Sequence, residues 1–166
     1  MSLDLERAAQ VAASLAFNLT LLVTPGPDAA QFGRVLSFAR ALAEAAPSRL
    51  CSAVAEAADP DGASLGLMRE GRAEGRVNVR FRALPEGLEF GVFLSALECL
   101  GRFVPAEAPL ELAAAVSVEC MTLPACTHCA PVAEALCRLA ARCPQLSVAV
   151  VDLQQAPQYV QRYALT

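Results

Sequence analysis

The segment Cys126-Thr127-His128-Cys129 holds the residues best suited to chemistry, because two cysteines three positions apart can form and break a disulfide reversibly. We expect this segment at the start of a helix, where unpaired N–H groups and a partial positive charge lower the pKa of a thiol. His128 is the only histidine of the chain, and its protonated form would lower the pKa of Cys126 further. The segment therefore predicts redox chemistry with a reactive thiolate.

The composition argues against a nucleic-acid partner. The 166 residues carry a net charge of −4, from 17 acidic residues and 13 basic residues that are all arginine. The run of arginines between positions 69 and 82 is interrupted by Glu70 and Glu74, so it forms no continuous basic stripe that could follow a phosphate backbone. We interpret this run as a solvated surface.

The sequence also predicts a cytoplasmic protein without membrane association. The longest apolar stretch, Val11 to Val23, contains polar residues and is shorter than the roughly 20 residues that a membrane span needs. The N-terminus carries Asp4 and Glu6 before its first arginine and lacks a convincing cleavage site, so we expect no signal peptide. Seven cysteines, an odd number, indicate intracellular thiols rather than a secreted disulfide framework.

The first part of the chain predicts a helix followed by an α/β module. Residues 1–16 form the helix, since apolar residues recur there at helical spacing. In the module, residues 17–104, a strand at 19–23 ends in a proline-rich turn, and Asp28 can cap the next helix. A crossing helix makes the following strand parallel to the first. The further elements are a strand at 49–55, a hairpin of strands at 64–68 and 77–83, and a helix at 88–100.

A degenerate repeat indicates a second module over residues 110–166. Aligning Pro47 with Pro144, which both stop a helix, gives an offset of 97 residues. The expected strand at 114–118, the motif helix and the strand at 146–151 then repeat the first strand, helix and strand. A short helix at about 157–163 follows. The dithiol falls opposite Ala29 and Phe32, so only the second copy carries the thiols.

The motif helix predicts different roles for the two cysteines. One apolar stripe runs along it, and Cys129 lies within this stripe whereas Cys126 lies outside it. We therefore expect Cys126 to be accessible and to attack, and Cys129 to be shielded and to resolve the mixed disulfide. The other residues of the predicted stripe are Val132, Leu136, Leu139, Ala140 and Cys143.

The segments 81–102 and 116–166 resemble the N-terminal domain of the alkyl hydroperoxide reductase flavoprotein subunit, with glutaredoxin-like protein disulfide oxidoreductases as relatives. The resemblance implies an α/β fold of two tandem thioredoxin/glutaredoxin-like modules, of which only the second carries the dithiol. It further implies electron transfer from a flavoprotein disulfide reductase to a peroxiredoxin. The residues that map are Cys126 and Cys129, and Glu89 matches an acidic residue near the dithiol. An exposed helix glutamate is the alternative for Glu89.

The chain departs from this resemblance in two places. The segment before the motif, Cys120 to Ala125, is longer than the turn of the relatives and adds a third nearby thiol. The chain also stops at Thr166, where the relatives continue into a cis-proline loop, a hairpin and a last helix. We therefore expect the second module to be truncated and the chain to be a fragment, the alternative being a partner strand that completes the sheet.

Two other functions fit the cysteines less well. A zinc site could draw its ligands from Cys120, Cys126, His128, Cys129, Cys137 and Cys143. A zinc ribbon, however, needs a second ligand pair at set spacing. A docking or adaptor domain with vestigial thiols is the non-enzymatic alternative. For the remaining cysteines we expect packing roles, and these are Cys51, Cys99, Cys137 and Cys143.

We therefore predict an enzyme, a protein dithiol–disulfide oxidoreductase with Cys126 as nucleophile and Cys129 as resolving thiol. His128 and Glu89 complete the predicted site. No cofactor is expected beyond the disulfide itself, and the partners are protein thiols and disulfides, with a homodimer also compatible with the sequence. The direction of electron flow stays open, because related folds span roughly −270 to −120 mV.

Overall fold

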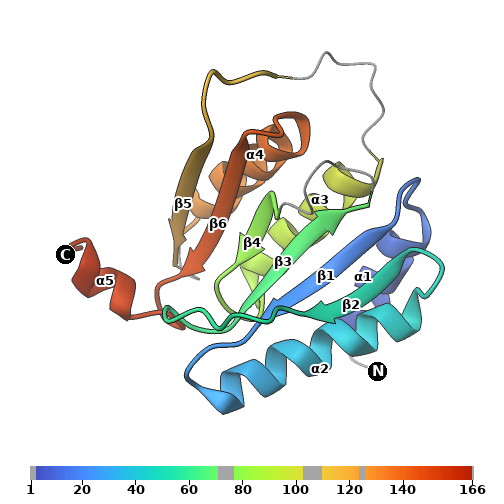
Figure 1. The fold of residues 1–166 in the computed structure, drawn as a ribbon, viewed down its shortest axis with the longest axis horizontal. Coiled ribbons are helices and arrows are strands. Elements are labelled where there is room, and N and C mark those ends of the chain that lie inside the picture. Colours follow the sequence, from blue (N-terminus) through green and yellow to red (C-terminus); the bar gives the residue numbers. More distant parts are fainter. Residues whose placement is uncertain (1–2, 71–76, 103–109, 124–125, 166) are drawn as a thin grey trace.

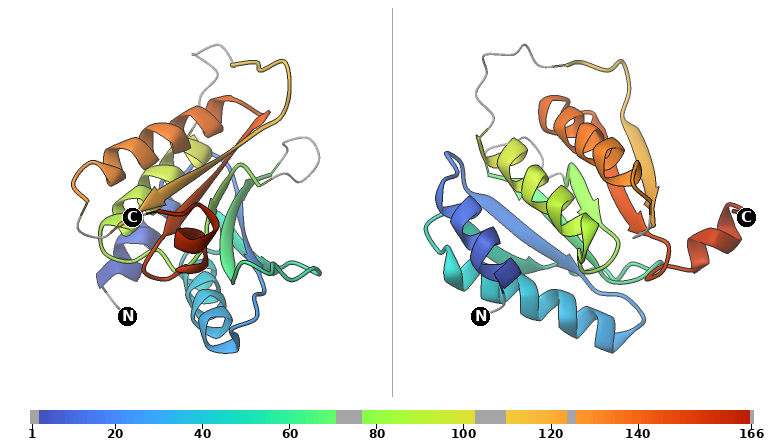
Figure 2. Two further views of the ribbon diagram at one scale, coloured as in Figure 1. Left: turned by 90° about the vertical axis from the view of Figure 1, so that its left-hand side faces the viewer. Right: turned by 180° about the vertical axis from the view of Figure 1, so that it is seen from behind.

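Six strands form one mixed sheet in the order β2-β1-β3-β4-β6-β5 (Figure 1). The computed structural model describes residues 3–70, 77–102, 110–123 and 126–165. The strands are β1 (Leu19–Thr24), β2 (Leu50–Val54), β3 (Ser64–Arg69), β4 (Val79–Phe81), β5 (Val116–Thr122) and β6 (Leu146–Asp152). The helices are α1 (Leu3–Ala13), α2 (Ala29–Ala45), α3 (Leu88–Arg102), α4 (Cys129–Arg142) and α5 (Gln158–Arg162). Figure 2 shows α1, α3 and α4 on one face of the sheet.

The predicted order of the first module is confirmed. β1 pairs with β2 in parallel and with β3 antiparallel, and β3 pairs with β4 antiparallel. Asp28 caps α2 as expected, since its side chain accepts hydrogen bonds from the N–H groups of Ala30 and Gln31 at 2.8 and 3.2 Å. Gly87 adopts a φ of +55° directly before α3, a conformation that glycine takes without a steric penalty.

The second unit, β5-α4-β6, continues the same sheet. β6 pairs in parallel with both β4 and β5, so the two predicted modules share one sheet, and their residue boundaries remain a prediction. The strand expected at 114–118 is displaced, because β5 begins at Val116 and extends to Thr122. Cys120, Met121 and Thr122 pair with β6. Part of the segment that the sequence suggested as a long turn is therefore strand.

The 97-residue repeat correctly aligns the C-terminal ends of α2 and α4, but the predicted buried face of α4 is wrong in part. The C-caps of α2 and α4 are Ala46 and Cys143, which are 97 residues apart as predicted. The predicted stripe of α4 is wrong at Val132 and Leu139, whose exposed fractions are 53% and 41%. The residues buried within α4 are Ala133, Cys137, Ala140 and Ala141. α4 packs against α3 as well as the sheet, and small side chains permit this close approach.

One apolar core extends under both units. It contains residues from α1 to β6, and its centre includes Phe81 and Phe93, whose ring centroids lie 5.7 Å apart in an edge-to-face arrangement. Phe93 also contacts the rings of Phe38 and Phe90. This shared core fixes α3, and with it Glu89, relative to the dithiol unit. None of the helices among the described residues is both long and apolar enough to cross a membrane.

Gly26 provides a test of the turn that follows β1. A Cβ atom added to Gly26 would lie 2.2 Å from the backbone nitrogen of Ala63 and 2.4 Å from the backbone carbon of Gly62. Because backbone atoms cannot rotate away, we expect Gly26→Ala to lower the free energy of unfolding by about 2–3 kcal/mol. Urea unfolding measures this change. Gly33→Ala is the matched control, since no atom lies within 4 Å of a Cβ added there; an equal loss in both variants would contradict the prediction.

Candidate dithiol active site

Cys126 and Cys129 form a disulfide, with their Cα atoms 5.5 Å apart. Cys126 lies in the turn after β5, and Cys129 is the first residue of α4. We predicted that the pair lies at the start of a helix. This is confirmed for Cys129, whereas Cys126 precedes the helix by three residues. The N–H of Cys126 donates to the carbonyl of Leu123 at 2.9 Å, and the N–H of Cys129 donates to the carbonyl of Cys126 at 3.3 Å. These bonds hold the turn that joins β5 to α4.

The predicted difference in accessibility between the two cysteines is absent from the disulfide form. Both residues are half-buried. The assignment of Cys126 as nucleophile and Cys129 as resolving thiol therefore stays a prediction. Position still distinguishes them, because only Cys129 belongs to the helix and is followed by residues such as Ala130 that pack against the core.

His128 is the N-cap residue of α4 and is exposed. Its backbone is helical, with φ −95° and ψ −16°, and its side chain makes no capping hydrogen bond. His128 is next to Cys129 in the sequence. It is not among the residues that line the pocket beside the disulfide. A direct effect of His128 on Cys126 remains a prediction.

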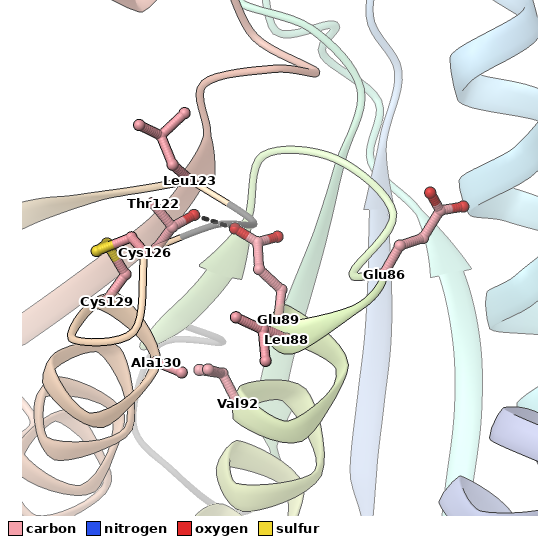
Figure 3. Close-up of a pocket in the computed structure, with 9 residues that line it drawn as sticks. All are labelled: Glu86, Leu88, Glu89, Val92, Thr122, Leu123, Cys126, Cys129 and Ala130. Carbon is pink, nitrogen blue, oxygen red and sulfur yellow. Dashed lines mark hydrogen bonds between the residues drawn. A yellow bond between two sulfur atoms is a disulfide. The ribbon is translucent and has the colours of Figure 1, made fainter.

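The disulfide forms one wall of a narrow pocket between α3 and the end of β5 (Figure 3). α3 supplies Leu88, Glu89 and Val92, and the residues around the disulfide supply Thr122 and Leu123. The other lining residues are Glu86, Cys126, Cys129 and Ala130. Four of the lining side chains are apolar, namely Leu88, Val92, Leu123 and Ala130. The side chain of Glu86 points away from the disulfide (Figure 3). The carboxyl group that faces the pocket next to the disulfide is Glu89.

Glu89 is buried, with an exposed fraction of 8%. This burial excludes the alternative of an exposed helix glutamate. Desolvation by burial raises the pKa of Glu89 to about 7, against an opposing hydrogen bond from Thr122 and with a smaller contribution from the charge of Asp152. A carboxyl group with this pKa can both accept and donate a proton near neutral pH, which is the property that general acid–base catalysis requires.

The hydroxyl of Thr122 connects Glu89 to the sheet. Thr122 is buried, and its Oγ1 lies within hydrogen-bond distance of both Glu89 Oε1 and the carbonyl oxygen of Val151, the latter at 3.1 Å. One hydroxyl has one proton, so its two contacts depend on the state of Glu89. Protonated Glu89 can donate to Thr122, which then donates to Val151. Ionised Glu89 instead accepts the proton of Thr122, and the Val151 carbonyl loses that donor.

The sequence analysis did not identify Thr122 as part of the site. The sequence did contain a pattern that could have identified Thr122. Side chains alternate along a strand, so Thr122 shares a face with Val118 and Cys120. Those two residues pack into the core, so a hydroxyl on the same face requires a buried partner. Glu89 is that partner, and only the packing of α3 against β5 brings the two together.

The cysteines outside the dithiol are free, and most are packed. Cys120, Cys137 and Cys143 are buried, and burial raises the pKa of Cys137 to about 12, which keeps it a thiol. Cys99 is half-buried in α3. The packing role predicted for Cys51 is wrong, because Cys51 is exposed on β2 and lies 3.1 Å from the hydroxyl of Thr20. In the described part of the chain, no three His, Cys, Asp or Glu side chains converge in a way that could hold a metal ion.

Comparisons with known proteins find similarity in structure. No protein-family model matches the sequence, and no curated protein matches it. The NTD_N/C domain of alkylhydroperoxide reductase AhpF from Enterococcus faecalis superposes with a TM-score of 0.76 at 18% identity, over 98% of this chain and 84% of that chain. AhpF from the same organism, as its C503A mutant, gives 0.75 at 20% identity, over 98% and 84% of the two chains.

An archaeal protein shares the same arrangement. A protein disulfide oxidoreductase from Aeropyrum pernix superposes with a TM-score of 0.68 at 14% identity, over 99% of this chain and 80% of that chain. These identities establish the fold alone. The chain therefore has the tandem thioredoxin-like α/β fold seen in the AhpF N-terminal domain and in this disulfide oxidoreductase, and it carries a Cys-x-x-Cys disulfide within that fold.

Proposed function

We propose that this protein is a dithiol–disulfide oxidoreductase that uses Cys126 and Cys129. The observation that carries the proposal is the buried carboxyl of Glu89, with a pKa of about 7, in the pocket that the disulfide lines. A disulfide that only stabilises the fold requires no proton acceptor. A disulfide that opens and closes in each turnover does require a proton acceptor, because a thiol must lose its proton before it attacks.

The reaction proceeds in two exchanges. In the first, the thiolate of Cys126 attacks one sulfur of a partner disulfide, forms a mixed disulfide and expels the other partner sulfur as a thiolate. In the second, Glu89 accepts the proton of the Cys129 thiol, and the Cys129 thiolate attacks the sulfur of Cys126. The second partner thiolate leaves, and the Cys126–Cys129 disulfide is restored. Two electrons have then passed to the partner, whose two thiolates take up one proton from Glu89 and one from solvent.

We further propose that a flavoprotein disulfide reductase reduces the Cys126–Cys129 disulfide and that a peroxiredoxin disulfide receives the electrons. The tandem fold shared with the AhpF domain supports this pair of partners. Exposed His128 between the two cysteines would assist by favouring the Cys126 thiolate when its imidazole is protonated. We place the reaction in the cytoplasm, because the odd number of cysteines is typical of a reducing compartment.

A covalent trap tests the proposal. Reduced Cys129→Ser protein is mixed with an oxidised peroxiredoxin, and we expect a mixed disulfide through Cys126 to accumulate, because the resolving thiol is missing. Mass spectrometry of the non-reduced adduct identifies the linked cysteine. The same protein carrying Cys126→Ser as well is the control and forms no adduct. If the Cys129→Ser protein forms no adduct with any protein disulfide, the protein is a docking module with vestigial thiols instead.

A further inference from the structure

Asp152 is a second buried carboxyl group beside the dithiol site. It is the last residue of β6, and its exposed fraction is 6%. The pairing of β5 with β6 places Asp152 directly opposite Thr122, the residue whose hydroxyl contacts Glu89. Side chains alternate along β6, and Val148 and Val150 of the same alternation pack into the core. The side chain of Asp152 therefore lies on the face of the sheet that Thr122 and Glu89 share.

The hydrogen bonds of Asp152 hold its carboxyl group in place without neutralising it. Oδ1 accepts from the backbone N–H of Gln154 at 2.8 Å, and Oδ2 accepts from Nε2 of Gln155 at 3.0 Å. Among the described residues, no arginine forms an ion pair with Asp152. Neutral N–H donors favour the carboxylate form but add no positive charge. The negative charge of Asp152 therefore acts on the buried groups around it.

Gln155 connects this carboxyl group to the segment that leads into α3. Its Nε2 atom donates a second hydrogen bond, to the carbonyl oxygen of Leu84 at 3.2 Å. Its Oε1 atom is buried and has no hydrogen-bond partner in the described part of the chain. The amide cannot turn over to find one, because both groups that Nε2 contacts are acceptors. Gln155 therefore fixes Asp152 relative to the first turn of α3, which contains Glu89.

Asp152 acts on Glu89 from the side of the sheet. Burial is the main cause that raises the pKa of Glu89, and the negative charge of Asp152 raises it further. The other titratable groups near Glu89 are the dithiol itself, Cys120 on β5 and Glu86. Burial raises the pKa of Cys120, which keeps it an uncharged thiol, and the side chain of Glu86 points away (Figure 3). Asp152 is therefore the fixed negative charge that Glu89 senses in both states of the dithiol.

From these observations, we infer that Asp152 is a positioning residue of the dithiol site, which enables Glu89 to hold and return a proton at neutral pH. Asp152 does not line the pocket beside the disulfide, so it acts through Glu89 and not on the sulfur atoms. Gln155 keeps the two carboxyl groups at a constant separation. The inference rests on the proposed function and adds a residue that sets the pH range in which the Cys129 thiol is deprotonated.

A titration of Glu89 tests the inference without turnover. NMR of the side-chain carboxyl carbons in the oxidised, isotope-labelled protein follows this titration, and Glu89→Gln identifies the signal. We expect Asp152→Asn to lower the midpoint by about 1 pH unit, because a neighbouring negative charge is removed. The inflection in the single-turnover rate of the second exchange should move by the same amount. The rate well above the inflection should stay near its normal value, since Glu89 is ionised there in both proteins.

Glu119→Gln is the matched control, because it removes the same charge from the same pair of strands. Glu119 alternates with Cys120 along β5 and therefore faces away from Glu89. We expect this variant to leave the midpoint of Glu89 unchanged. An equal shift in Glu119→Gln and Asp152→Asn would attribute the effect to the net charge of the protein and overturn the inference.

A second measurement does not depend on whether Asp152→Asn folds. In the unmodified protein, the carboxyl carbon of Asp152 should show a small step at the midpoint of Glu89, because two neighbouring carboxyl groups sense each other's charge. Glu89→Gln should remove this step. A signal of Asp152 that is constant through the titration of Glu89 would overturn the inference.

The covalent trap with Cys129→Ser separates this inference from the proposed function. A normal adduct, together with a midpoint of Glu89 that Asp152→Asn leaves unchanged, overturns the inference alone and leaves the oxidoreductase intact. A midpoint that moves without a matching move of the kinetic inflection also overturns the inference, because Asp152 then has no effect on the reaction. The absence of an adduct with any protein disulfide overturns the proposed function, whatever the titration shows.

Discussion

Cys126→Ser lowers the rate of protein disulfide reduction by roughly 1,000-fold or more, to the level of the uncatalysed exchange. The reason is that the serine hydroxyl neither ionises near neutral pH nor forms a disulfide, so the first exchange has no nucleophile. Insulin reduction with a dithiol reductant measures the rate. The variant should retain its fold, because serine differs from cysteine by one atom and Cys126 is only half-buried.

The control for this loss is Cys51→Ser, which changes an exposed thiol on β2 at the opposite edge of the sheet. It should retain the full rate of insulin reduction. Two results would contradict the assignment of Cys126 as nucleophile. One is activity in Cys126→Ser above the rate without protein, and the other is an equal loss in Cys51→Ser.

Glu89→Gln lowers the maximal rate by about 100-fold, the contribution expected of a general base. In the unmodified protein, the rate of the second exchange rises through the pKa of Glu89, about pH 7, because only the ionised carboxylate accepts the proton of Cys129. Glutamine has nearly the same shape and cannot accept that proton, so the inflection near pH 7 should disappear. Single-turnover kinetics from pH 5 to about pH 9 resolve this exchange.

Two variants separate the chemical role of Glu89 from its packing. Glu86→Gln is the matched control, since Glu86 lines the same pocket but points away from the disulfide (Figure 3), and it should retain both rate and inflection. Thr122→Val removes the hydrogen bond that lowers the pKa of Glu89, so the inflection should move to higher pH while the rate at high pH stays near its normal value. An unchanged profile in Glu89→Gln would rule out this residue as the base.

Glu89→Gln should also change how the free energy of unfolding depends on pH. The pKa of Glu89 is about 7 in the folded protein, above its ordinary value of 4.5, so the folded state holds a proton that the unfolded state has lost. The free energy of unfolding therefore falls between pH 4.5 and 7, by about 3 kcal/mol in total. Oxidised Glu89→Gln should lack this decrease and be more stable than the unmodified protein at pH 8. Urea unfolding across this pH range measures the difference.

Much of the fold could be predicted from the sequence. Local signals were sufficient for Asp28 as the cap of α2, for the parallel pair β1 and β2, and for the hairpin of β3 and β4. These features depend on residues that are close in sequence or on a crossover rule with few exceptions. The face of α4 could not be predicted in the same way. Val132 and Leu139 were expected in the core and are exposed, whereas the buried residues of α4 are small ones, in a helix that packs against both α3 and the sheet.

The sequence by itself determined the chemistry available to this protein. The spacing of Cys126 and Cys129 permits a disulfide between them, and the structure contains that bond. Tertiary structure alone decided the environment of the pair. Glu89 precedes Cys126 by 37 positions in the printed sequence, and its burial beside Thr122 depends on how α3 packs against the end of β5. Burial sets the pKa of that carboxyl, and burial arises from contacts distant in sequence, which no local pattern can specify.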